Sequence, residues 1–413
     1  MKVLHVIADM DPVKGGVCQA VRSMVAGLSQ LGIQNEVVSL DAPSAPFLSI
    51  DPFPIHALGP ASGPWQYSAR LLPWLYEQLP SYDKVLVHGL WLYPGFAVRQ
   101  ALKKLPQHSA AISIPDVFIL PHGMLDPYFQ RAANRKWKAL RNSLYWRLLE
   151  SKLINRAEGI FFTSADELLL ARQPFRPYSP RQEQVVGLGI PSPPACHSSL
   201  KQAFSTKCPE VEAEPYLLYL GRLHEKKGVK ILLDAYAQLL NTQPQEEAAD
   251  ACTTYPACGF LARLPKLVIA GPGLDTAYGR ELRRLVHDTP GMQRSVLFPG
   301  MLQGEAKWGA YYGCELFVLP SHQENFGIAV VEALACGRPV MISNQINIWR
   351  EIAAGKSGLV ADDTVQGTAD ALKQWLTMSP EQKQLMGKHA RQVYENQFAM
   401  DRAATKLLAA LSG

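Results

Sequence analysis

A strand, a polar loop and a helix follow one another so clearly in one stretch that they constrain the fold of the whole chain. The apolar run Leu316–Leu319 predicts a buried strand. Gly327 then predicts the start of a helix, which Gly337 and Pro339 end. In open α/β sheets, ligands bind beyond the carboxyl ends of the strands, where the free N–H groups of a helix attract anions. The stretch therefore predicts an α/β fold with an anion-binding loop.

Two carboxylates, Glu324 and Glu332, bracket this expected helix start. A rise of about 1.5 Å per helical residue places them about 10 Å apart. That is too far for the nucleophile and acid of a retaining glycosidase, which lie about 5 Å apart. Two interpretations follow. The stretch is either an ordinary strand–helix unit with a surface glutamate and a partly solvated helix glutamate, or a site that holds two ends of one extended ligand.

The length and composition bound the fold class. A chain of 413 residues suits two domains, each of about 200 residues. Apolar runs repeatedly precede amphipathic stretches, which indicates an α/β architecture. The net charge of +5 is too small to indicate nucleic acid. The seven cysteines are scattered and form no C-x-x-C pair, so we expect neither a disulfide framework nor a zinc site.

Residues 1–8 are too short and too interrupted for a signal peptide, and they predict a first strand. The chain has no run of about 18 apolar residues, so no membrane-spanning helix is expected. We therefore expect a reduced, cytoplasmic protein.

A double glycine, Gly15-Gly16, stands between the first expected strand and a helix expected from about residue 17 to 31. Such glycines let the backbone approach a phosphate, although many strand–helix turns use them for geometry alone. In the same loop, Asp9 and Asp11 resemble a metal-binding D-x-D pair. Their position directly after the first strand favours a structural role over a metal site.

Two further expected strands end in His-Gly, at His88 and His122. A lone histidine is usually a hydrogen-bonded structural residue. Two at corresponding strand ends, on the edge where a ligand is expected, favour His122 as a site residue. For His88, both a structural role and a role in the site stay open.

The segment 131–156 is predicted to be helical and strongly basic, with a single acid, Glu150. Its basic residues are Arg131, Arg135, Lys136, Lys138, Arg141, Arg147, Lys152 and Arg156. Apolar residues recur at helical spacing, namely Trp137, Leu140, Leu144 and Leu148. Either this stripe faces the core beneath a solvated basic face, or the segment adsorbs to an anionic membrane leaflet or a phosphate-bearing acceptor.

Residues from about 191 to 215 are rich in Pro and Ser and lack apolar periodicity, which predicts a domain boundary. A new strand is expected at 216–220, and the turn after it carries Arg222, Lys226 and Lys227. Cations in a glycine-containing turn suit the binding of a diphosphate. Farther on, the polar segment 241–264 predicts a mobile surface loop.

Taken in order, these motifs resemble glycosyltransferase family 4, a large group of retaining enzymes with the GT-B fold. The resemblance rests on Gly15-Gly16, His122-Gly123, Gly221-Arg222-Leu223 with Lys227-Gly228, and Glu324-x7-Glu332 followed by residues 333–340. Each motif alone is common, and their order along the chain makes the resemblance specific. The C-terminal half matches best, and the N-terminal half matches loosely.

The resemblance implies two Rossmann-like domains that face each other across a donor-binding cleft. Residues 1–200 would form the acceptor-side domain and residues 201–386 the nucleotide-sugar-binding domain. A C-terminal helix, about 387–413, would cross back to the first domain.

The resemblance also implies roles for single residues. Arg222 and Lys227 would neutralise the donor diphosphate, and Glu332 would hold the ribose hydroxyls. Glu324 and His122 would contact the transferred sugar. Arg222, Lys227, Glu324 and His122 are therefore the expected catalytic residues.

The remaining donor contacts are expected from the backbone near the base, the phosphates and the sugar. They are Gly15, Gly16, Leu302, Asn325, Phe326, Gly327 and Ile328. The family needs neither a metal nor a cofactor, because the nucleotide-diphosphate sugar is a co-substrate.

The implied reaction moves a hexose to a hydroxyl acceptor with retention of anomeric configuration, in cell-surface polysaccharide or glycolipid synthesis. The acceptor would be a saccharide, lipid-linked in one version, and the segment 131–156 could contact the inner face of the cell membrane. The alternatives are a GT-B nucleotide-sugar epimerase and a non-catalytic nucleotide-sugar-binding partner. A Rossmann dehydrogenase is disfavoured because no G-x-G-x-x-G follows the first strand. The sequence does not indicate the sugar, the base (UDP, GDP or ADP) or the linkage.

Overall fold

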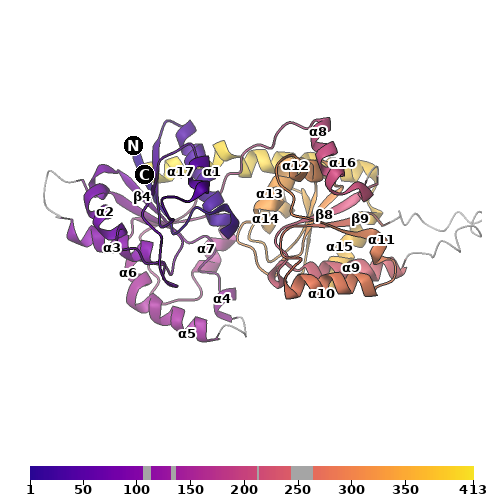
Figure 1. Ribbon diagram of the computed structural model, residues 1–413, viewed down its shortest axis with the longest axis horizontal. Coiled ribbons are helices and arrows are strands. Elements are labelled where there is room, and N and C mark those ends of the chain that lie inside the picture. The colour runs from indigo at the N-terminus through magenta and orange to yellow at the C-terminus, as the bar shows by residue number, and fades with distance from the viewer. Residues whose placement is uncertain (106–112, 132–135, 212–213, 243–263) are drawn as a thin grey trace, which may run out of the picture. The chain divides into compact units, whose positions relative to one another are not determined.

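The computed structural model describes residues 1–105, 113–131, 136–211, 214–242 and 264–413. The chain forms two compact units, of which unit 1 is Met1–Pro191 with Phe398–Gly413 and unit 2 is Ser192–Gln397. Each unit is an all-parallel sheet with helices on its faces (Figure 1). The prediction of an α/β chain with two Rossmann-like parts is confirmed.

The division between the units differs in place from the expected one. It lies at Pro191–Ser192, at the start of the Pro- and Ser-rich stretch, rather than at residue 200. The chain returns to unit 1 at Phe398 rather than near residue 387. The tail is also two helices rather than one, because a π-helical segment, Tyr394–Phe398, separates α16 (Pro380–Val393) from α17 (Met400–Ser412).

Unit 1 has a seven-stranded sheet in the order β3-β2-β1-β4-β5-β6-β7. The strands are β1 (Lys2–Val6), β2 (Gln34–Ser39), β3 (Ile55–Ala57), β4 (Lys84–His88), β5 (Asp116–Leu120), β6 (Gly159–Phe162) and β7 (Glu183–Val185). The strand order reverses between β1 and β4, which is the kind of switch point where open α/β sheets bind ligands. His88, the last residue of β4, pairs with Leu120, the last residue of β5, so both strands end at the same level.

Helices cover both faces of this sheet (Figure 1). They are α1 (Gly16–Gln30), α2 (Leu71–Gln78), α3 (Tyr93–Lys104), α4 (Tyr128–Arg131), α5 (Lys136–Tyr145), α6 (Ser151–Ile154), α7 (Ala165–Ala171) and the C-terminal α17. α17 packs on α1, and small residues allow the close approach. A Cβ added to Gly27 would lie 2.8 Å from the Cβ of Ala404.

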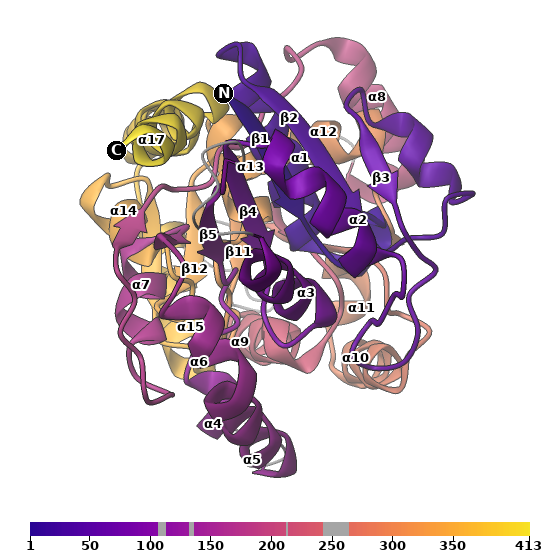
Figure 2. The same cartoon turned by 90° about the vertical axis from the view of Figure 1, so that its left-hand side faces the viewer.

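The first part of the basic segment, α5, projects from unit 1 next to α4, below α6 in Figure 2. A core-facing apolar stripe was one interpretation of this segment, and it is wrong. The exposed fractions are 85% for Trp137, 64% for Leu140, 60% for Leu144 and 53% for Leu148. A π-helix, Trp146–Glu150, follows α5 and turns its own Trp146 into the core instead, where that side chain is 1% exposed.

Unit 2 has a six-stranded sheet in the order β10-β9-β8-β11-β12-β13. The strands are β8 (Tyr216–Leu220), β9 (Lys266–Ala270), β10 (Val296–Gly300), β11 (Leu316–Leu319), β12 (Val340–Ser343) and β13 (Gly358–Ala361). Its helices are α8 (Ser198–Lys207), α9 (Val229–Thr242), α10 (Ala277–Asp288), α11 (Met292–Ser295), α12 (Gly304–Gly313), α13 (Ile328–Ala335), α14 (Trp349–Ala354), α15 (Val365–Thr377) and α16. The strand order reverses between β8 and β11, so the two motifs rich in charged residues flank the switch point.

Two expectations concern the chain as a whole. The loop expected at 241–264 lies mostly outside the described residues. Within the described ranges, no helix combines the length and the apolar character needed to cross a bilayer.

Glu150 provides a test of how unit 1 is packed. The side chain is 3% exposed, and its Oε1 accepts a 2.8 Å hydrogen bond from the backbone N–H of Trp91. Burial raises the pKa of Glu150 from 4.5 to about 7. The unfolded chain releases this proton at a lower pH than the folded chain does, so the contribution of Glu150 to the free energy of unfolding falls as the pH rises from 4.5 to about 7 and is level above that.

We therefore predict that Glu150→Gln raises the free energy of unfolding, relative to the wild-type chain, more at alkaline pH than at acidic pH. At about 1.4 kcal/mol per pKa unit, the advantage of the variant should grow by about 3 kcal/mol between acidic and alkaline pH. Urea unfolding of both proteins across this pH range measures the difference, with the exposed Glu77→Gln as the control. An unchanged difference across the range would contradict the burial argument.

Candidate functional site

The loop after β8 is fixed to the loop after β11. A short 3-10 turn, Glu225–Lys227, follows β8, and the carbonyl of Lys226 accepts a 2.9 Å hydrogen bond from the N–H of His322. Gly228 then takes a left-handed conformation (φ 68°) directly against Pro320. A Cβ at Gly228 would collide with the Pro320 carbonyl oxygen, so only glycine allows the two loops to approach this closely.

This approach brings together Lys227 and Glu324, two of the expected catalytic residues. They form an ion pair with side chains 22% and 20% exposed. Burial and the positive charges of Lys226 and Arg222 lower the pKa of Lys227 to about 7. Contact with the Glu324 carboxylate acts in the opposite direction and favours the charged amine. The guanidinium of Arg222 is exposed and has no side-chain partner in the described part of the chain.

The loop that carries Glu324 is held on both sides of the residue. The N–H of Glu324 donates to the carbonyl of Gln345 at 3.0 Å, and its carbonyl accepts from the N–H of Asn347 at 3.1 Å. Phe326 is buried, and Gly327 (φ 74°) precedes the first residue of α13. The first N–H groups of α13 therefore stand next to Glu324, free of i→i−4 bonds. Asn325 and Ile328 lie in the same turn.

Glu332 lies inside α13, and α12 fixes its carboxylate. Lys307 donates to Oε1 at 2.6 Å, and the hydroxyl of Tyr311 donates to Oε2 at 3.0 Å. Two carboxylate oxygens offer about four acceptor positions, so these two bonds leave room for a ligand's hydroxyls. The side chain of Glu332 is 12% exposed, so this helix glutamate is partly solvated.

The neighbouring strands β8, β9 and β10 end at the same edge of the unit 2 sheet. The N–H of Gly221 donates to the carbonyl of Ala270 at 3.0 Å, and that of Gly271 donates to the carbonyl of Gly300 at 2.8 Å. Leu302 follows in the loop between β10 and α12, with its side chain buried. Its backbone is the part of the residue that remains for a ligand.

In unit 1, Gly15 and Gly16 form the entry to α1. Gly15 takes φ 130°, which favours glycine, and Gly16 is the first helical residue. The two acids of the same loop have structural partners. Asp11 accepts from the N–H of Val13 at 2.9 Å, and Asp9 forms an ion pair with Lys14 at 3.3 Å.

His122 follows β5 and is partly exposed, and its Nε2 lies 2.9 Å from Nδ1 of His88. His88 itself is buried, which makes it a partner of His122 rather than a surface residue. The turn is fixed by Glu167, whose Oε1 accepts from the N–H of Gly123 at 2.6 Å.

The sequence missed the residues that hold the expected site residues in place. These are Lys307 and Tyr311 around Glu332, the backbone of residues 345–347 around Glu324, and His5 beneath His88. The spacing of Lys307 and Tyr311 puts them on one face of a helix, which would have been a usable signal. The loop at 345–347 carries no comparable signal.

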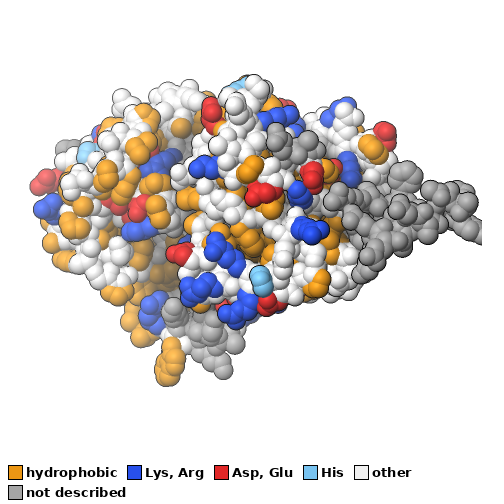
Figure 3. Space-filling view, turned by 45° about the vertical axis from the view of Figure 1, so that its right-hand side comes forward, with side chains coloured by type: hydrophobic (Ala, Val, Ile, Leu, Met, Phe, Trp, Pro, Cys, Tyr) orange, Lys and Arg blue, Asp and Glu red, His pale blue; other side chains and the backbone are white. Residues whose placement is uncertain are grey.

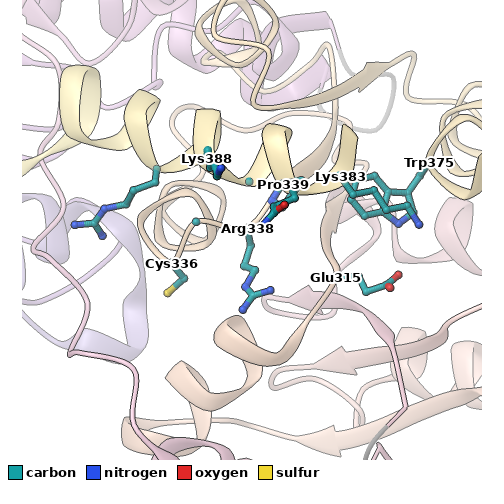
Figure 4. A pocket seen from close by; sticks show the side chains of 11 residues that line it. Glu315, Cys336, Arg338, Pro339, Trp375, Lys383 and Lys388 are labelled. Carbon is teal, nitrogen blue, oxygen red and sulfur yellow. The ribbon is translucent and has the colours of Figure 1, made fainter. Parts of the chain in front are cut away.

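A separate cavity of about 560 Å³ lies at the opposite end of the unit 2 sheet (Figure 4). Arg338 and Pro339, just before β12, line it together with Trp375 of α15 and Lys383 and Lys388 of α16. None of the expected site residues contributes to its lining.

Both units match protein-family models. The model described as "Glycosyl transferases group 1" matches residues 201–393. The model described as "Glycosyl transferase 4-like domain" matches residues 15–189. The chain belongs to the group 1 glycosyl transferases. The two matches fall on unit 2 and unit 1, and they include every expected site residue.

Curated relatives match this glycosyl transferase over part of their length. The D-inositol 3-phosphate glycosyltransferase of Corynebacterium jeikeium is 33% identical over 175 residues, which cover 42% of this chain and 37% of that protein. The mannosylfructose-phosphate synthase of Agrobacterium fabrum is 30% identical over 149 residues, which cover 35% and 29%. The chain thus spans well under half the length of these relatives.

Solved structures share the whole fold of this glycosyl transferase at low sequence identity. Anabaena HepE, in complex with UDP and glucose, aligns with a TM-score of 0.74 and 17% identity over all of both chains. Sucrose-phosphate synthase from Thermosynechococcus elongatus aligns with a TM-score of 0.68 and 20% identity, over all of this chain and 98% of the other. These alignments establish the GT-B architecture.

We predict that Gly228→Ala destabilises unit 2 more than Gly337→Ala does. Both glycines have φ 68°, but a Cβ at Gly337 would lie 3.7 Å from its nearest neighbour. Left-handed strain alone costs about 1–2 kcal/mol, and only the change at Gly228 adds a collision. The difference in unfolding free energy should exceed about 1 kcal/mol. Equal losses in the two variants, measured by urea unfolding, would show that the contact with Pro320 is unimportant.

Proposed function

We propose that this chain transfers a hexose from a nucleotide-diphosphate sugar to a hydroxyl of a saccharide acceptor, with retention of anomeric configuration. One observation carries the proposal. In a member of the glycosyl transferase family, Lys227 and Glu324 meet beside Arg222 at the strand switch point of unit 2. Cations and a carboxylate at that edge suit the two parts of such a donor, the diphosphate and the sugar.

In the scheme that we propose, Lys227 and Glu324 neutralise each other until a donor binds. A diphosphate bound next to Arg222 would attract Lys227 away from Glu324. The carboxylate would then be released to accept hydrogen bonds from the sugar hydroxyls. In this scheme Lys227 has an anionic partner both before and after binding, and Glu324 exchanges its ion pair for hydrogen bonds from the sugar, so neither group is left without a partner. Gly327 and the start of α13 add N–H groups towards the phosphates.

The chemistry needs stabilisation of negative charge more than proton transfer from the protein. Breaking the sugar–phosphate bond leaves an oxocarbenium-like sugar and a diphosphate whose charge grows. Arg222, Lys227 and the N-terminus of α13 would stabilise that charge. Glu324 is committed to binding, so we propose substitution on the same face of the sugar, with the leaving phosphate taking the proton of the acceptor hydroxyl. A trapped glycosyl–enzyme adduct or an inverted product would contradict this step.

The printed names of the relatives support a sugar-transfer role without fixing the substrates. Two relatives are named for products or acceptors that are phosphorylated polyols or sugars. One structural neighbour was determined with UDP-glucose. We propose a nucleotide-sugar donor on this basis and leave the base and the sugar to experiment. Glu332, held by Lys307 and Tyr311, is proposed to bind the ribose, with the backbone at Leu302 next to the base.

We further propose that unit 1 docks on an anionic membrane surface through residues 136–156. The exposed apolar residues of α5 lie among exposed cations, including Arg141, Arg147 and Lys152. Glu150, the acid of this segment, is buried. Orange and blue side chains lie side by side at the lower end of the view in Figure 3, where α5 projects. Apolar side chains framed by cations suit the interface of a negatively charged leaflet. A lipid-linked acceptor of a cell-surface glycan would be found there.

We predict that a true donor raises the melting temperature and supports transfer. UDP-glucose, GDP-mannose and ADP-glucose are compared by thermal shift, because a ligand that binds only the folded state stabilises it by mass action. Turnover is then measured with the donor that binds. Arg222→Ala and Lys227→Ala should each lower kcat/KM by about 10²–10³-fold. Lys230→Ala, which removes an exposed cation one turn later, should not.

The products separate the alternatives. A free rearranged sugar would identify an epimerase, and donor binding without turnover would identify a non-catalytic binding partner. Near-normal turnover in both the Arg222 and Lys227 variants would remove these residues from the site.

We predict that the apolar side chains of α5 carry membrane binding. The double variant Trp137→Ser/Leu144→Ser should lose affinity for vesicles of anionic phospholipid by about tenfold or more, because each side chain contributes about 1–3 kcal/mol when buried. The matched control is Leu169→Ser/Leu385→Ser, since these leucines are 52% and 53% exposed on other helices. Equal co-sedimentation of both double variants, or equal binding to neutral vesicles, would contradict the proposal.

A further inference from the structure

Three histidines form a continuous chain in unit 1, from β2 to the loop after β5. Nε2 of His5 lies 3.2 Å from Oδ1 of Asn35, and its Nδ1 lies 3.0 Å from Nε2 of His88. Nδ1 of His88 lies 2.9 Å from Nε2 of His122. Successive rings are inclined by only 11° and 21°, with centroids 5.2 Å apart in both pairs. The rings are therefore arranged end to end and nearly coplanar, as in-plane N–H···N bonds require.

Asn35 fixes the direction of this chain. Its Nδ2 donates to the carbonyl of Ile33 at 2.9 Å and to the hydroxyl of Ser29 at 3.2 Å. Since both amide hydrogens are used, Oδ1 is the atom that meets His5, and it can only accept. His5 must therefore carry its hydrogen on Nε2.

The remaining tautomers follow from the first. A neutral imidazole has one donor and one acceptor nitrogen, so Nδ1 of His5 accepts from Nε2 of His88. By the same argument, Nδ1 of His88 accepts from Nε2 of His122. The last atom of the chain, Nδ1 of His122, then has a lone pair and no hydrogen. No described residue donates to that atom.

Burial keeps the three imidazole rings neutral. His5 and His88 are 0% and 4% exposed. Burial lowers the pKa of His5 and of His122 to about 4 and lowers that of His88 as well. No carboxylate belongs to the chain of contacts, so nothing within it favours an imidazolium.

We propose that Asn35, His5 and His88 are positioning residues that fix His122 as a neutral imidazole whose Nδ1 accepts a hydrogen bond from a hydroxyl of a bound sugar. This inference rests on the proposed function for its ligand, but not for the tautomers. The role suits the chemistry, because an acceptor without positive charge does not repel a sugar that develops an oxocarbenium character. The ring has little freedom to turn, since Nε2 is bound to His88 and Glu167 holds the next backbone N–H.

The tautomers are tested by nitrogen NMR on the ¹⁵N-histidine-labelled full chain. We expect hydrogen on Nε2 of all three rings and scalar couplings across both N–H···N bonds. We also expect no protonation of these rings between about pH 6 and about pH 8, where an ordinary histidine titrates. Hydrogen on Nδ1 of His122, or a missing coupling to His88, would overturn the proposal.

The positioning role is tested by a double-mutant cycle on kcat/KM. His88→Phe removes the acceptor of His122, and we expect a loss of about tenfold or more. The same change in a His122→Ala background should have little further effect, because its consequence passes through His122. His88→Gln, whose side-chain oxygen can accept from His122, should retain more activity than His88→Phe. Losses that multiply in the double variant would overturn the role.

Sugar transfer and the histidine tautomers are refuted by different results. A wild-type chain that transfers no sugar would refute the proposed function, and the NMR couplings would still decide the tautomers. A chain that transfers sugar with a different set of tautomers would refute the histidine chain alone.

Discussion

The contact between the loops after β8 and β11 is the constraint on which unit 2 depends. Parallel strands that lie side by side end at one edge, and a reversal of strand order leaves the loops of the two central strands without a crossing helix between them. In that space the backbone of Gly228 lies directly against the Pro320 carbonyl, with no room for a Cβ. Lys227 and Glu324 are distant in sequence, and this backbone approach puts their charges in contact.

Both acids of the Glu324–Glu332 pair have a basic partner, but their surroundings differ. Glu332 is held by two side chains of one neighbouring helix, so its position is set before any ligand binds. The backbone of Glu324 is held on both sides, and among the described residues its carboxylate has one partner, Lys227, on a loop with excess positive charge. The first arrangement favours a fixed recognition point. The second allows an exchange of partners, which a ligand with both negative and hydroxyl groups would need.

The sequence predicted the elements of each unit well because local pattern determines them. Apolar runs became strands, and Gly327 and Gly16 became helix starts. The sequence-based prediction failed where packing between elements determines the structure. The stripe at Trp137 has the periodicity of a core-facing helix, yet α5 projects away from the sheet and nothing in the described chain covers it. Neither the partner of Glu332 on α12 nor the partner of His88 in β1 was identified from the sequence, because Lys307 and His5 are far away in sequence and meet them only in the folded unit.

The path of the chain has a consequence for biosynthesis. Unit 1 is made of residues from both sides of unit 2, since α17 packs on α1 after the whole of unit 2 has been passed. A ribosome that adds residues from the N-terminus completes the sheet of unit 1 early, but α17 can pack at Gly27 only after residues 400–412 emerge. Unit 2 is continuous and can fold in between. The face of α1 around Gly27 therefore has no α17 partner while unit 2 is being synthesised.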